Sequence, residues 1–131
     1  MVNTIQTSLS GLIASTKKLD ATSSNIANAD TVGSLTDPDN APYNALQTRQ
    51  TSENGGVNAE FVTKNPPFVP SYAPNSPFAD ENGLIGAPNV NLTEELVISK
   101  EAEFAYKANA FTLKTGIEMQ ETLLNAIDKD A

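Results

Sequence analysis

The stretch NLTEELVISKEAEFAYKANAFTLKTGIEMQETLLNAI, residues 91–127, decides the fold of this chain. Mostly apolar residues recur along it at spacings of three and four without a break, which is typical of a helix that packs lengthwise against another helix. Asn91, with Glu94 three residues later, is a capping pattern that predicts where the helix begins. At a rise of about 1.5 Å per residue, the predicted helix is roughly 55 Å long.

A second stretch with the same period lies at the other end of the chain. Ile5, Leu9, Leu12, Leu19 and Ile26 follow one another at helical spacing between a predicted cap at Asn3 and a polar exit near residue 28. We therefore expect a mainly α protein, in which long N- and C-terminal helices pair as a coiled coil.

The middle of the chain has a different composition. All eight prolines lie in residues 30–90, so helix is unfavourable there. Residues 43–51 and 57–64 suit short strands on either side of Asn54-Gly55-Gly56, and residues 66–77 suit an extended, polyproline-like arm. The predicted division is a discontinuous helical domain, 1–29 with 91–131, and a small irregular or β-containing middle segment, 30–90.

Two apolar stripes on the C-terminal helix predict two kinds of contact. For the seam of the helix pair we expect Leu12, Leu19, Leu96, Tyr106, Leu113 and Ile117. Beside it, Val97, Phe104 and Phe111 repeat every seven residues, and the narrow N-terminal stripe is too small to cover both. We assign this second stripe to contacts between subunits. The plainer alternative is an amphipathic helix packed on the middle segment.

Composition excludes several classes of function. The net charge of −8 disfavours a nucleic-acid or anionic-membrane surface. The chain has no Cys and no His, which removes thiol chemistry, zinc fingers and the usual general base at neutral pH. The acidic loop at Asp37 has Pro42 where a calcium loop requires Gly. We therefore expect no catalytic residue, metal or cofactor.

No targeting or spanning segment is apparent. The first 15 residues lack the basic and apolar regions of a signal peptide, and no apolar run approaches about 18 residues. The sequence predicts no membrane insertion and, if the protein leaves the cytoplasm, no cleaved signal.

Two motifs carry a resemblance to a known family. The run SNIANADTVG, residues 24–33, resembles the SNxANxxTxG signature that closes the N-terminal helix of bacterial flagellar rod and hook proteins. The run AYKAN, residues 105–109, resembles the AYxAN signature of their C-terminal helix. The resemblance implies helix-end or interface roles for the signature positions Asn25, Asn28, Gly33, Tyr106 and Asn109.

The middle of the chain narrows the resemblance to the proximal rod members of the flagellar basal-body rod protein family. Residues 38–43, PDNAPY, and residues 72–91 are similar to segments of that branch. Four residues depart from its pattern: Asn40 replaces Gly, Ser76 replaces His, Leu84 replaces Tyr, and Phe104 stands where a cation is common.

The resemblance implies a structural subunit of the flagellar basal-body rod, the tubular drive shaft across the periplasm. Such subunits leave the cell body through the flagellar type III export apparatus and assemble with other rod subunits and with copies of themselves around the export channel. They transmit torque by packing.

A function of another class also fits part of the sequence. A soluble helical export chaperone or adaptor that binds a partner helix would explain the acidity and the excess of apolar surface. It does not explain the proline-rich middle or the paired motifs at the two ends.

Overall fold

The computed structural model describes residues 2–130, with side chains described from 3 to 129. Its two long helices are α1, Val2–Ala27, and α2, Leu92–Asp130. The predicted start of α2 is confirmed, because Oδ1 of Asn91 accepts from the amides of Thr93 (3.0 Å) and Glu94 (3.3 Å). The predicted cap at Asn3 is wrong: α1 already begins at Val2, and Asn3 lies within its first turn.

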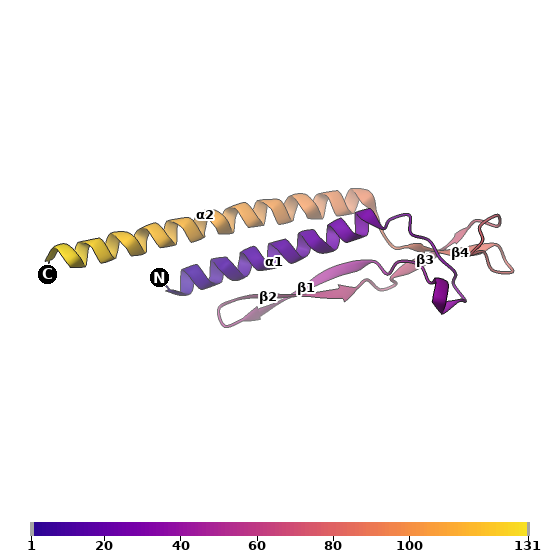
Figure 1. Ribbon diagram of the computed structural model, residues 1–131, viewed down its shortest axis with the longest axis horizontal. Helices are drawn as coiled ribbons and strands as arrows, with labels where there is room; N and C mark the ends of the chain where they lie inside the picture. The colour runs from indigo at the N-terminus through magenta and orange to yellow at the C-terminus, as the bar shows by residue number, and fades with distance from the viewer. Residues whose placement is uncertain (1, 131) are drawn as a thin grey trace.

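The helices run antiparallel and side by side, which confirms the predicted pairing (Figure 1). Gly11 lies opposite Asn109, and Gly116 lies opposite Ile5. Because α2 has 39 residues and α1 has 26, the C-terminal part of α2 continues past the start of α1.

A β-hairpin lies along α1 on the side away from α2 (Figure 1). Its strands β1, Leu46–Glu53, and β2, Gly56–Thr63, are antiparallel and register Leu46 with Thr63. The turn residues Asn54 and Gly55 both have positive φ, 49° and 80°, as the tightest hairpin turns require. The predicted break between two strands is confirmed. The layers are thus α2, α1 and the first hairpin.

A second hairpin lies beyond the helix pair, at the end where α1 finishes and α2 starts (Figure 1). It pairs β3, Phe68–Tyr72, with β4, Leu84–Pro88. Gly33 adds a bridge to Gly86, with N–H···O distances of 3.0 and 2.8 Å. The predicted polyproline arm over residues 66–77 is therefore wrong from Phe68 to Tyr72. Pro70 is accommodated because β3 is an edge strand, where a missing N–H donor can be tolerated.

In the helix pair and the first hairpin the buried side chains are small or polar, whereas the second hairpin buries Ile85. Ala14, Ala21, Ala59 and Ala102 are at most 3% exposed, whereas Phe104 is 76% exposed. Thin layers held at close distance by alanine leave no room for aromatic side chains between them. The larger apolar side chains consequently lie on the outside.

None of the helices in residues 2–130 combines the length and the hydropathy needed to span a bilayer.

Candidate functional site: the helix-pair surface and the Asn25 hub

The contact between α1 and α2 is made by a stripe of small residues. Ala102 and Ser15 are buried, and Gly11 lies against Asn109 so closely that a Cβ at position 11 would lie 2.5 Å from its Oδ1. Gly116 is also buried, with Ile5 nearby. Glycine and alanine let the helix backbones approach, so the pair is tight without large side chains in its centre.

This buried stripe is offset by one residue from the seam that the sequence predicts. Glu95, Ala102 and Gly116 are buried, whereas the predicted members Leu96 and Ile117, each one residue later, are 61% and 43% exposed. Successive residues of a helix are rotated by about 100° about its axis. The predicted apolar stripe therefore lies along the edge of the helix pair and not in its centre. The other predicted seam residues follow this pattern: Leu12 and Leu113 are half-buried, and Leu19 and Tyr106 are exposed.

The second predicted stripe is open in the single chain. Val97, Phe104 and Phe111 are 55%, 76% and 73% exposed, and they share one line along α2 because they are spaced by seven residues. Leu96 lies beside Val97 and Phe104 around a shallow apolar hollow. These side chains form a band of exposed apolar positions along α2, interrupted by the exposed charged residues Lys100, Glu101 and Lys107.

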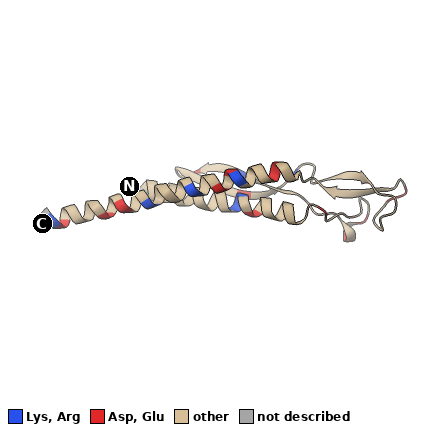
Figure 2. Cartoon of the chain, turned by 90° about the horizontal axis from the view of Figure 1, so that it is seen from above, with Lys and Arg blue, Asp and Glu red and all other residues tan. Residues whose placement is uncertain are grey.

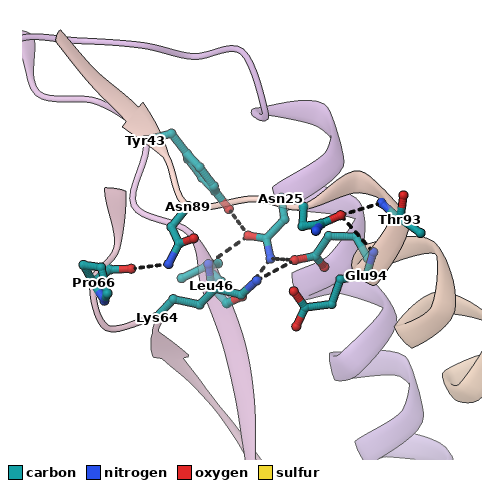
Figure 3. A network of polar contacts seen from close by, with 10 residues as sticks. Asn25, Tyr43, Leu46, Lys64, Pro66, Asn89, Thr93 and Glu94 are labelled. Atoms are coloured by element: carbon teal, nitrogen blue, oxygen red, sulfur yellow. Dashed lines mark hydrogen bonds and ion pairs between the residues drawn. The ribbon is translucent and has the colours of Figure 1, made fainter. Parts of the chain in front are cut away.

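Asn25 is the hub of a buried polar network where α1, α2 and β1 meet (Figure 3). Its Nδ2 donates to Leu46 O (2.7 Å) and to Glu95 Oε1 (2.9 Å). Its Oδ1 accepts from Leu46 N (2.8 Å) and from Tyr43 Oη (3.1 Å). The Asn25 amide therefore pairs with the edge of β1 as a neighbouring strand would, and it joins the end of α1 to the start of α2.

Glu95 anchors the α2 side of the hub. Its side chain is 1% exposed and accepts from Lys64 Nζ at 2.9 Å, so the buried carboxylate faces a cation. Tyr43 Oη also lies 2.9 Å from Ser24 Oγ. Among the residues with described side chains, every buried side-chain nitrogen and oxygen has a hydrogen-bond partner. All hydrogen-bonding groups of the hub side chains therefore have partners, and a buried polar network stabilises a fold under this condition. Because it joins the helices to the first hairpin, we also call the hub a polar clasp.

Sequence reasoning missed most of this hub. The family signature pointed to Asn25, but Glu95 resembled an ordinary acidic residue in the first turn of a helix. The run of two glutamates directly after the cap of α2 held no signal that one of them is buried. Its partners Asn25 and Lys64 are 70 and 31 residues away in sequence.

The other signature positions lie close to the hub or on the helix pair. Asn28 closes α1, since its Nδ2 donates to Ser24 O at 2.9 Å. A Cβ at Gly33 would collide with the backbone between Asn40 and Pro42, so this position requires glycine. Asn109 packs on Gly11, and Tyr106 lies at the exposed edge of the pair.

Charged residues are spread along the outside of α2, whereas α1 carries only Lys17, Lys18 and Asp20 (Figure 2). Lys107 and Lys100 both bind Glu103, at 2.6 and 2.9 Å. These hydrogen bonds, with Lys107 contributing most, lower the pKa of Glu103 from 4.5 to about 2.

No group of three or more acidic residues within residues 2–130 is arranged to hold a metal ion. The feature that this arrangement offers for function is an exposed surface. It consists of the apolar band on α2, and the polar network around Asn25 holds the helix pair in position.

Comparison with known proteins identifies the family to which this chain belongs. A sequence profile described as "Flagella basal body rod protein" matches residues 5–33, the stretch that contains most of α1 and its exit. The chain is 35% identical over 122 residues to the flagellar basal-body rod protein FlgC of Salmonella typhimurium, which covers 88% of this chain and 89% of the relative. The chain belongs to the FlgC family of flagellar basal-body rod proteins.

FlgC proteins of two other bacteria also match over most of the chain. The Agrobacterium fabrum protein is 36% identical over 76% of each chain, and the Aquifex aeolicus protein is 30% identical over 85% of this chain and 87% of its own. As a member of the FlgC family, the chain is a structural subunit of the flagellar basal-body rod, and it is not an enzyme. Membership also decides between the two functions left open by the sequence, in favour of the rod subunit over the export chaperone.

Proposed function

We propose that the chain joins neighbouring rod subunits through the outer side of its helix pair. The observation that carries this proposal is the exposed apolar band on α2, where Phe104 and Phe111 are 76% and 73% exposed. A group of large exposed apolar side chains of this kind marks an interaction site. In a rod subunit, the partners that can cover it are copies of the same chain and other rod subunits.

In this proposal the terminal helices of successive subunits form the inner, tubular layer of the proximal rod around the export channel. The helix pair acts as a stiff element, and the hub at Asn25 fixes its angle to the first hairpin, so load passes between subunits by packing. The division into a helical domain, 1–29 with 91–131, and a middle segment, 30–90, belongs to the same proposal.

The proposed route to the periplasm is the flagellar type III export apparatus, without removal of an N-terminal signal. The family assignment supports this route. Deletion of residues 2–20 is then expected to abolish secretion, while the secreted full-length chain keeps its N-terminal sequence.

The decisive experiment replaces the exposed aromatic residues of α2. A strain that lacks the chain is complemented with Phe104→Ala or Phe111→Ala, and swimming and secretion are measured. Each change removes an aromatic contact worth roughly 3 kcal/mol when fully covered by a partner. Because both side chains are exposed in the single chain, we expect normal synthesis and export but weaker rod assembly and reduced swimming.

Thr112→Ala is the matched control, because Thr112 is exposed on the same helix and its Oγ1 only bonds Ala108 O within the helix. This variant is expected to swim normally. Normal swimming of the double variant Phe104→Ala/Phe111→Ala would refute the proposed contact surface, as would loss of either single variant before export.

A further inference from the structure

The second hairpin is attached to the rest of the molecule only through connecting segments. Within residues 2–130, no Cα of β3 or β4 lies within 8 Å of a Cα of α1, α2, β1 or β2. The hairpin extends away from the end of the helix pair (Figure 1). The chain passes between these two parts four times: after α1, before β1, after β2 and before α2.

The second hairpin has tight packing of its own. The loop that follows α1 folds over it, so that a Cβ at Gly86 would lie 2.6 Å from Cγ of Pro42 and 3.3 Å from Cδ2 of Leu35. Residues 33–42 and 68–88 therefore form one small packed body, which we call the outer unit.

The four connecting segments are hydrogen-bonded to one another. The backbone amides of Ala45 and Asn89 both donate to Pro67 O, at 3.1 Å each. The amide of Tyr43 donates to Thr31 O, also at 3.1 Å. We call these connecting segments the neck, which comprises residues 28–32, 43–45, 64–67 and 89–91.

Asn89 makes the side-chain bond that joins the last segment of the neck to the third. Its Nδ2 donates to Pro66 O at 2.8 Å (Figure 3). Together with the amide bond to Pro67 O, Asn89 thus holds two successive carbonyl groups of the facing segment. One hydrogen bond lets two segments rotate about it, whereas two bonds to neighbouring carbonyls also fix their orientation.

We propose that the neck is a hinge and that the side chain of Asn89 holds it at a fixed angle. The hub around Asn25 makes the helix pair and the first hairpin one body, and the outer unit is the other. Because no contact between their strands and helices limits a rotation, the bonds within the neck set the angle. In a rod subunit, a force that passes between the helix pair and the outer unit must cross this hinge.

The Asn89 side chain suits a device that sets an angle without carrying the fold. Its bond to Pro66 O is exposed to solvent. An exposed neutral hydrogen bond contributes little to the free energy of unfolding, because water replaces the lost partner. Removal of the side chain is therefore expected to loosen the hinge while both bodies stay folded.

Distances between spin labels test this proposal on the full-length chain. The chain has no cysteine, so labels can be placed at Ser23→Cys on α1 and Ser71→Cys on β3, both of which are exposed. Double electron–electron resonance is expected to give one narrow distance distribution across the neck. In Asn89→Ala the distribution is expected to shift and to broaden.

A second label pair, Ser23→Cys/Ser52→Cys, lies within the body that contains α1 and the first hairpin, and both positions are exposed. Its distance distribution is expected to be unchanged by Asn89→Ala. If this distance broadens as well, Asn89 acts on the whole fold, and the assignment of a hinge is overturned.

Two further variants isolate the hydrogen bond itself. Asn89→Asp keeps the outline of the side chain but has no amide donor, so it is expected to behave as Asn89→Ala does. Asn44→Ala is the matched control, because Asn44 is an exposed asparagine of the same neck without a side-chain hydrogen bond to any described residue. The proposal is overturned if neither Asn89 variant changes the distance across the neck, or if Asn44→Ala broadens it equally.

Discussion

Gly11 and Asn109 set the closest approach between the two long helices. A Cβ on Gly11 would lie 2.5 Å from Oδ1 and 2.6 Å from Cγ of Asn109. The Asn109 side chain cannot move away freely, because its Nδ2 donates to Ala105 O at 2.9 Å. Any larger residue at position 11 must separate the helices or break that hydrogen bond.

The first prediction compares two glycines in this helix pair. Gly11→Val is expected to lower the free energy of unfolding by about 2 kcal/mol, because it overpacks the contact with Asn109. Gly116→Ala is expected to raise it by up to about 1 kcal/mol through helix propensity, since the nearest atom to its added Cβ is 3.5 Å away. Urea unfolding followed by circular dichroism measures both changes. A stabilising Gly11→Val would show that the helices are not in contact at this point.

The sequence predicted the elements well because their signals are local. Asn91 caps α2 through bonds to residues two and three positions later, and Asn54-Gly55 builds its turn from its own backbone angles. The strand Phe68–Tyr72 was missed because its sequence, FVPSY, contains a proline and its partner strand begins 12 residues after it ends. Nothing within this segment indicates that pairing.

The offset of the helix contact was harder to predict. Periodicity detects a stripe of large apolar residues, but it does not say whether the same chain or a neighbour covers that stripe. Here the stripe that contains Leu96 and Ile117 borders the contact, and the adjacent stripe with Ala102 and Gly116 forms it. Small residues give a weak hydrophobic signal even where they determine the approach of two helices.

The second prediction concerns the hub. Asn25→Ala removes four hydrogen bonds and leaves both backbone groups of Leu46 without their partner, while Glu95 keeps only Lys64. Each unsatisfied buried group costs about 1–3 kcal/mol, so we expect a loss of about 4 kcal/mol in unfolding free energy. Asn28→Ala is the control, because it removes a single bond to Ser24 O in a half-exposed place and should cost about 1 kcal/mol. Equal losses for the two variants would contradict the central role of Asn25.

The third prediction concerns pH. The pKa of Glu103 is about 2 in the folded chain and 4.5 without its partners, so folding favours the charged carboxylate. The stabilisation is complete above pH 4.5 and is lost as the pH falls towards 2. NMR titration of the Glu103 carboxyl group is expected to show the low pKa in the folded chain. Lys107→Met should raise the pKa more than Lys100→Met, because Lys107 is the closer cation. Identical titration in all three proteins would rule out these ion pairs in solution.

The last prediction separates a buried ion pair from an exposed one. Lys64 and Glu95 lie 2.9 Å apart with side chains 14% and 1% exposed, whereas Arg49 and Glu60 lie 3.0 Å apart with side chains 65% and 54% exposed. Lys64→Met leaves the buried Glu95 carboxylate without its cation, which is expected to cost about 3 kcal/mol in unfolding free energy.

Arg49→Met should cost less than about 1 kcal/mol, because solvent screens the exposed pair. Combining Lys64→Met with Glu95→Gln should recover part of the loss, since the buried charge is then removed together with its partner. Urea unfolding of the four proteins tests this order. If Lys64→Met is no more destabilising than Arg49→Met, the carboxylate at the start of α2 is not held in a buried state, and the clasp between the helices and the first hairpin is open in solution.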